Sequence, residues 1–99
     1  MPRRPHAEPW HADALRSRLH ARGLDHLRVR KRGAVLTIES GPDEQPWPHA
    51  RLKRDTVHLW TLDMAVRGGR WETTPFRGTM DELVAILVDD FPWTIAAIE

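Results

Sequence analysis

The side chains that could carry nucleophilic catalysis are few, because the chain has no cysteine and only two serines. Neither Ser17 nor Ser40 lies on the glycine-flanked turn between a strand and a helix that presents a catalytic serine. The glycine pair at 68–69 precedes no predicted helix, so it does not form a phosphate-binding loop. The sequence therefore predicts neither kind of site.

Carboxylates could instead share a proton in general acid–base catalysis. The acidic pair at 89–90 falls at the solvated end of a predicted helix, where we expect no raised pKa. Asp63 and Glu72 would serve this chemistry only by converging with His58 in a deep pocket that shifts their pKa values. We predict a non-enzymatic protein without catalytic residues, and keep a small enzyme as an alternative.

Six histidines raise the question of a metal site. Metal ligands must converge on one point with a defined geometry, which a helical i, i+4 pair or close alternation on a strand can provide. No two of the histidines have such a spacing. The sequence predicts no metal and no cofactor, and a metal-binding domain stays within the enzyme alternative. The histidines are His6, His11, His20, His26, His49 and His58.

A run of cationic side chains at 28–32 is the clearest candidate for a binding surface. Arg28 and Arg30 point to one side of a predicted strand, and the following turn adds two more cations. Such a surface can follow phosphates, with a strong dependence on salt. It could equally neutralise the acidic last helix. The predicted nucleic-acid or acidic-partner site comprises Arg16, Arg18, Arg22, Arg28, Arg30, Lys31 and Arg32.

Five tryptophans are many for a chain of 99 residues. Trp60 and Trp71 lie in predicted strands and are expected to pack in the core or on the sheet. The other three lie at boundaries and in loops, where indole rings tend to mark interfaces. The predicted protein interface comprises Trp10, Trp47, Trp93, Ile95 and Ile98.

Composition predicts one globular domain over residues 1–99, with 40% hydrophobic and 29% charged residues. No apolar run approaches the roughly 20 residues of a membrane span, and the absence of cysteine suits a reducing cytoplasm. The net charge of +1 conceals a polarity, because residues 1–33 are strongly basic and residues 71–99 strongly acidic. We expect a cytoplasmic chain that does not bind membranes.

Local patterns predict two helices and five strands. Three prolines make residues 1–9 a loose arm, Gly23 ends the first helix with Leu24 placed to contact Leu19, and residues 40–48 form a proline-rich loop. The capping box from Thr79 to Glu82 starts the last helix. The predicted elements are a helix over 10–22, strands over 27–30, 34–39, 49–53, 56–64 and 70–76, and a helix over 80–90.

Short turns between successive strands indicate an antiparallel sheet, made of a hairpin and a three-stranded meander, with 56–64 as its central strand. Both amphipathic helices should cover one face of this sheet. The fold class is therefore α+β, in the order α-β-β-β-β-β-α.

The order helix, strands, helix also occurs in double-stranded RNA-binding domains, but those begin their last helix with a basic cluster, and this chain has Thr79 to Glu82 there. From residue 27 to about 95 the chain is more similar to a family of small uncharacterised bacterial α+β domains. The similarity rests on residues 34–39, 48–52, 70–72 and 80–83. It implies the order of elements and no activity.

The resulting hypothesis is a non-enzymatic bacterial accessory or regulatory module that binds a macromolecule, of the antitoxin, immunity or defence-associated type. A protein partner or self-association comes first, and a nucleic acid bound by the basic first helix and hairpin is the alternative.

Overall fold

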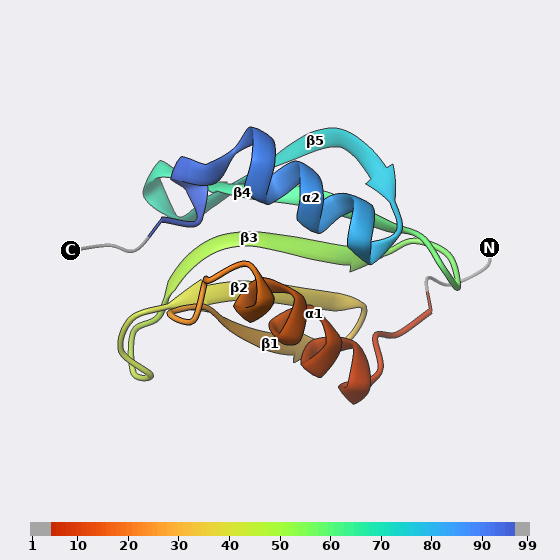
Figure 1. The fold of residues 1–99 in the computed structure, drawn as a ribbon, viewed down its shortest axis with the longest axis horizontal. Coiled ribbons are helices and arrows are strands. Elements are labelled where there is room, and N and C mark those ends of the chain that lie inside the picture. The colour runs from red at the N-terminus through yellow and green to blue at the C-terminus, as the bar shows by residue number, and fades with distance from the viewer. Residues whose placement is uncertain (1–4, 97–99) are drawn as a thin grey trace.

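One sheet of five antiparallel strands carries two helices on one face, as seen in a computed structural model that describes residues 5–96 (Figure 1). The order of elements confirms the predicted α+β class. The elements are α1 (Pro9–Ala21), β1 (Arg28–Arg32), β2 (Val35–Ser40), β3 (Trp47–Arg54), β4 (Trp60–Val66), β5 (Arg70–Gly78) and α2 (Met80–Asp90), with short 3-10 turns at Arg67–Gly69 and Pro92–Thr94. The strands lie side by side in chain order, so the expected hairpin and meander form one continuous five-stranded meander.

The two helices begin and end at the expected signals. After α1, the backbone N–H of Leu24 donates to the carbonyl of Leu19 at 3.1 Å, and Gly23 has a φ of 82°, as a Schellman-type end requires. Before α2, the Thr79 hydroxyl accepts from the N–H of Glu82, whose carboxylate accepts from the N–H of Thr79. These contacts use backbone groups that helix ends leave free.

The core lies between the helices and the sheet. Leu36, Leu52 and Leu62 face one another across β2, β3 and β4, and each is fully buried. Leucines from both helices close over them, and burying each such side chain stabilises the fold by roughly 1.5–3 kcal/mol. The helix leucines are Leu15, Leu19, Leu83 and Leu87.

Two strand predictions are wrong. Residues 55–59 form a loop, in which the N–H of Asp55 donates to the Leu59 carbonyl and Arg54 donates to the Val57 carbonyl, so β4 begins only at Trp60. The central strand is β3, not the strand predicted at 56–64, because β4 has one strand beyond it and three before it. The prediction was too long because the apolar residues of this loop resemble those of a strand.

The proline-rich loop is shorter than predicted. Trp47 and Pro48 already belong to β3, where they pair with Ser40 and Glu39, and only residues 41–46 form the connection. Gly41 allows this turn, because its φ is 84° and the Trp47 ring occupies the space where a Cβ would lie.

The predicted loose arm is wrong for its described part. Ala7 is buried, and its N–H donates to the carbonyl of Gly33 at 2.9 Å, while Arg54 donates to the carbonyl of His6. These contacts fix residues 6–7 against the sheet. Residues 1–4 lie outside the described part of the chain.

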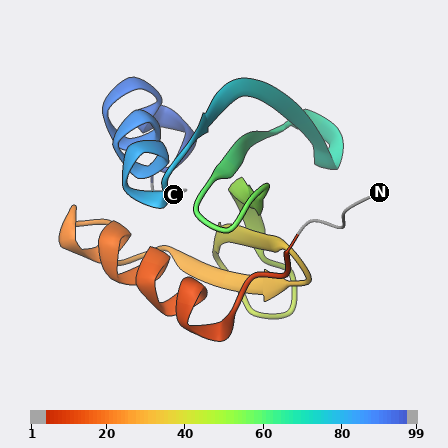
Figure 2. The same cartoon turned by 90° about the vertical axis from the view of Figure 1, so that its right-hand side faces the viewer.

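Neither α1 nor α2 lies on the opposite face of the sheet (Figure 2). Irregularities in the strand register at Ile38/Glu39 and at Thr61/Asp63 bend the sheet, as β-bulges do. Neither α1 nor α2 has the length and apolar character that a membrane crossing requires.

Candidate functional site

The side of the sheet opposite the two helices, which we call the open face, collects cationic side chains. Strand alternation and register place on it the residues that do not face the leucine core. Its charged side chains on β1 to β4 are five cations and two carboxylates. They are Arg28, Arg30, Arg32, Arg51, Lys53, Glu39 and Asp63.

A hollow of about 390 Å³ lies in the open face. We call it the open-face hollow. Arg30 and Arg32 from β1 line it together with Trp71 from β5, although these two strands are opposite edges of the sheet. In a flat sheet these edges would be about 19 Å apart, so the sheet must curve around the hollow. The remaining lining residues are Val35, Thr37, Glu39, Pro46, Pro48 and Arg51.

The centre of the open face is a buried carboxylate held by two cations. Asp63 is 1% exposed, and its Oδ2 lies 2.8 Å from Arg51 Nε and 3.2 Å from Lys53 Nζ. The Arg51 guanidinium also lies over the Trp71 ring, 4.3 Å from the ring centroid. Arg51 is therefore held from two directions, by an ion pair along its edge and by a cation–π contact on its plane.

The β1 cations are placed differently from one another. Arg30 is exposed and lies 3.1 Å from the buried carboxylate of Glu39. Arg28 turns toward the 41–46 loop, where it donates to the Gly41 carbonyl at 2.6 Å. Arg32 is exposed at the rim of the hollow and forms no ion pair with any residue from 5 to 96. Lys31 pairs in register with the core residue Leu36, so it points to the helix side and not, as predicted, with Arg28 and Arg30.

The cations of α1 do not extend this surface. Arg18 forms an ion pair with Asp81, and Arg22 lies 3.3 Å from Asp89, so α1 neutralises α2. The sequence left open whether the hairpin neutralises the acidic last helix, and within residues 5–96 no hairpin cation forms an ion pair with α2. The two helices lie side by side on the same face of the sheet, which places α1 closer to those acids than β1 (Figure 1). Arg16 pairs within its own helix with Asp13 at 3.4 Å.

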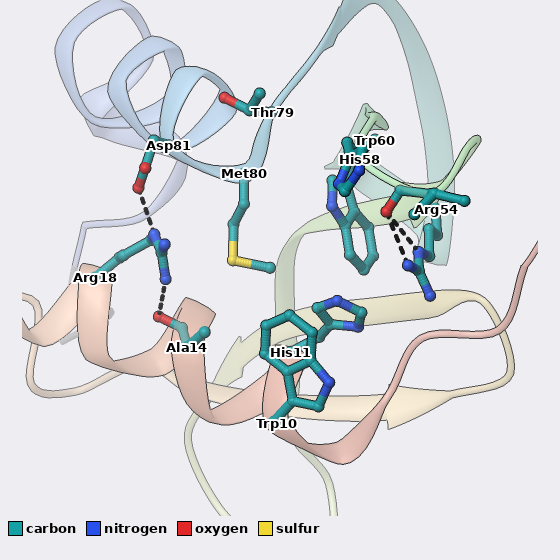
Figure 3. Close-up of a pocket in the computed structure, with 11 residues that line it drawn as sticks. Trp10, His11, Ala14, Arg18, Arg54, His58, Trp60, Thr79, Met80 and Asp81 are labelled. Atoms are coloured by element: carbon teal, nitrogen blue, oxygen red, sulfur yellow. Dashed lines mark hydrogen bonds and ion pairs between the residues drawn. The ribbon is translucent and has the colours of Figure 1, made fainter.

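A second hollow, of about 370 Å³, lies where the N-terminal ends of both helices meet the 55–59 loop (Figure 3). We call it the end pocket. Trp10, Trp60 and Met80 contribute to its apolar wall, and the Arg18–Asp81 ion pair lies on one side. Its other lining residues are His11, Ala14, Arg54, Val57, His58 and Thr79.

The histidine chemistry of the end pocket is that of a neutral ring. His11 Nδ1 accepts a hydrogen bond from the backbone N–H of Glu8 at 2.8 Å, which places the ring proton on Nε2. Burial is the main cause that lowers the pKa of His11, and the Arg54 charge lowers it further. Its ring lies between those of Trp10 and Trp60, with centroids 3.8 and 5.1 Å away. His11 thus packs as a neutral aromatic residue.

The residues considered for acid–base catalysis do not converge. His58 lines the end pocket, Asp63 lies beneath Arg51 and Lys53 on the open face, and Glu72 lies at a third hollow beside Trp93. Within residues 5–96, no three histidine or acidic side chains are close enough to hold a metal ion.

The predicted interface residues separate into exposed and buried ones. Trp10 is 63% exposed, Trp93 70% and Trp47 40%. Ile95 was predicted to meet a partner but is instead buried in the core. Two histidines bind the backbone of this segment, since His49 donates to the carbonyl of Thr94 and His26 to that of Ile95. Ile98 lies outside the described residues.

Sequence reasoning missed the part of the open face that lies beyond the hairpin. Arg51 and Lys53 flank the core residue Leu52, so their alternation already placed both on the opposite face of the strand. The position of Trp71 beside Arg51 carried no such signal, because the two residues are brought together only by the sheet register.

No protein-family model, no curated protein and no solved structure matches this chain.

Proposed function

We propose that this chain is a non-enzymatic accessory or regulatory module of a bacterial cytoplasm, of the antitoxin, immunity or defence-associated type, and that it binds nucleic acid on its open face. The observation that carries the proposal is the concentration of cationic side chains on a sheet face that no described helix covers. Nucleic-acid backbones are polyanions, and neutralising their phosphates supplies most of the affinity of sequence-independent binding.

The distribution of ion pairs supports the open face over the helix side. On the helix side, Arg18 and Arg22 are each paired with an acid of α2, which cancels their charge toward a ligand. On the open face four of the five cations also contact a carboxylate, but Arg32 has no acidic partner within residues 5–96. Arg30 keeps 63% of its side chain exposed although it contacts Glu39. The open face therefore presents net positive charge where a backbone can reach it.

The cations at the hollow also set the expected salt dependence. Arg30 and Arg32 are exposed at the hollow, whereas Arg51 is held by Asp63 and Trp71, so about two phosphates can be contacted there. For single strands, the logarithm of the binding constant falls with the logarithm of the salt concentration with a slope of roughly −0.7 per phosphate, so we expect about −1.4.

Two adjacent residues of one hairpin allow a matched test. Lys31 and Arg32 are both exposed cations, but Arg32 faces the open face and Lys31 the helix side. Fluorescence anisotropy of labelled oligonucleotides at about 0.15 M salt, where the Debye length is about 8 Å, separates the two faces. We expect Arg32→Glu to weaken binding severalfold more than Lys31→Glu. Equal effects of the two variants, or no binding by the wild-type protein at low salt, would contradict the proposal.

A protein partner remains the second candidate, because large apolar side chains are exposed around the end pocket. Trp10 and Val57 are 63% and 60% exposed at its rim. A partner that inserts an apolar side chain would cover both. On binding or self-association, the backbone amides at the start of α1 and in the 55–59 loop should then become protected from hydrogen exchange. The Trp10→Ser variant should not show this protection. Protection confined to Trp93 and the 41–46 loop would place the partner at the other end of the molecule.

A further inference from the structure

The shape and chemistry of the open-face hollow indicate which form of nucleic acid it takes. This inference rests on the proposed function. We infer that the hollow receives one unpaired base of a single-stranded nucleic acid, stacked against the wall formed by Arg51 and Trp71, while Arg30 and Arg32 contact the adjoining phosphates.

The Arg51–Trp71 wall is positioned before any ligand arrives. Arg51 Nε donates a 2.8 Å hydrogen bond to the buried Asp63 carboxylate, and the Arg51 guanidinium lies 4.3 Å from the Trp71 ring centroid. Only 26% of the Arg51 side chain is exposed. Guanidinium planes and indole rings are the groups on which unpaired bases stack. A surface already held in place costs little further ordering when a base binds.

The floor and the opposite side of the hollow provide the other contacts that a nucleotide needs. Thr37 and Glu39 from β2 line it, and the Glu39 carboxylate is almost fully buried beside Arg30. A hydroxyl and a carboxylate can form hydrogen bonds with the polar edge of a base. Across from the Trp71 wall, Arg30 and Arg32 are both exposed. Base-binding groups thus lie inside the hollow and phosphate-binding groups at its rim.

The concavity of the site favours single strands over duplexes. The hollow has a volume of about 390 Å³ and its lining comes from both edges of the curved sheet. A duplex presents a convex phosphate surface with its bases paired inside, so a base could enter only by leaving its stack. Single strands offer bases that are already free.

The test compares single strands and duplexes of equal length, in DNA and in RNA, by fluorescence anisotropy with the purified protein. We expect single strands to bind at least about tenfold more tightly than duplexes at about 0.15 M salt. Trp71→Ala should weaken single-strand binding about tenfold or more, whereas Trp71→Phe, which keeps a ring, should retain most of it. Arg51→Lys keeps the positive charge but removes the planar guanidinium, so it should weaken the binding of single strands more than that of duplexes. Trp93→Ala, an exposed tryptophan elsewhere, serves as the matched control.

The outcomes separate this inference from the proposed function. If duplexes bind as tightly as single strands, or if Trp71→Ala acts like Trp93→Ala, the base-binding inference is wrong, while a loss on Arg32→Glu would still support nucleic-acid binding. If no oligonucleotide binds even at low salt, the proposed function itself fails. Circular dichroism melting of each variant establishes that it is folded. A preference between DNA and RNA strands identifies which of the two is the ligand.

Discussion

Arg51 on β3 and Asp63 on β4 are direct cross-strand neighbours, and the guanidinium donates a 2.8 Å hydrogen bond to a carboxylate that is 1% exposed. Lys53 contacts the same oxygen from two positions further along β3. The carboxylate thus joins two cations of the open face that would otherwise repel each other. It holds the cationic surface together and also reduces its charge.

Removing this carboxylate should destabilise the protein. In Asp63→Ala, Arg51 and Lys53 lose their shared partner while both side chains stay about three-quarters buried. Losing one member of a buried ion pair typically costs about 3–5 kcal/mol, and we expect about 3 kcal/mol here because the cations retain some contact with water. Urea denaturation measures this loss. Glu72→Ala, at an exposed carboxylate on β5, should change the free energy of unfolding by less than about 0.5 kcal/mol. If Asp63→Ala lowers the free energy of unfolding as little as Glu72→Ala does, the buried ion pair does not contribute to stability.

Gly41 and Gly23 allow backbone strain to be separated from packing. Both have a positive φ, 84° and 82°, but a Cβ at Gly41 would lie 2.7 Å from the Trp47 ring, whereas a Cβ at Gly23 meets nothing within 4 Å. Gly23→Ala should cost about 1 kcal/mol from its backbone conformation alone. Gly41→Ala should cost at least about 1 kcal/mol more, because the ring must move.

A Trp47→Ala background provides the control for this pair. With the ring absent, Gly41→Ala should cost the same as Gly23→Ala in chemical denaturation. An unchanged difference in that background would mean that Trp47 is not the cause.

Stability should fall as the pH drops below about 6.5 because of the buried histidines, whose pKa values are lowered in the folded state. His49 Nδ1 donates to the Thr94 carbonyl, and its Nε2 accepts from the Ser40 hydroxyl. A ring with one donor and one acceptor nitrogen is neutral. Burial, as the main cause, lowers its pKa below the ordinary value of 6.5. The unfolded state therefore binds the proton more readily. The contribution of His49 to stability is complete above pH 6.5 and is lost as the pH falls from there toward the folded-state pKa.

The measurement is the free energy of unfolding by urea across this pH range. His49→Gln should flatten the profile, and His11 should account for part of the slope that remains, since its pKa is also lowered. Ser17→Ala, at an exposed position without a titratable group, is the control and should leave the slope unchanged. A profile that rises as the pH falls would contradict the assignment.

The N-terminal cap of α2 should contribute about 1 kcal/mol to the free energy of unfolding. Thr79→Ala removes the hydroxyl that accepts from the Glu82 N–H, a group without another partner inside the helix. Thr79→Ser keeps the hydroxyl and should retain most of the stability. Thermal denaturation of the two variants measures the difference, and equal melting temperatures would show that the cap contributes nothing.

The local elements of this protein could be predicted because their signals lie within a few residues. The end of α1 needs only Gly23 and Leu24, and the start of α2 needs only Thr79 and Glu82, so both helices lie where the sequence placed them. The antiparallel connections followed from short turns. Errors arose where a local signal competed with tertiary packing, as at the 55–59 loop and at Trp47, which joins β3 despite its flanking prolines.

By itself, the amino-acid sequence determined the order of elements, the α+β class and the alternation that separates the leucine core from the cations on β1 and β3. Only the tertiary structure decided which charges neutralise one another and which stay free. Arg18 and Arg22 meet α2 because both helices pack on the same face of the sheet, whereas Arg30, Arg32, Arg51 and Trp71 surround one hollow because the sheet is curved. These relationships join residues 20 to 70 positions apart, so no local pattern could reveal them.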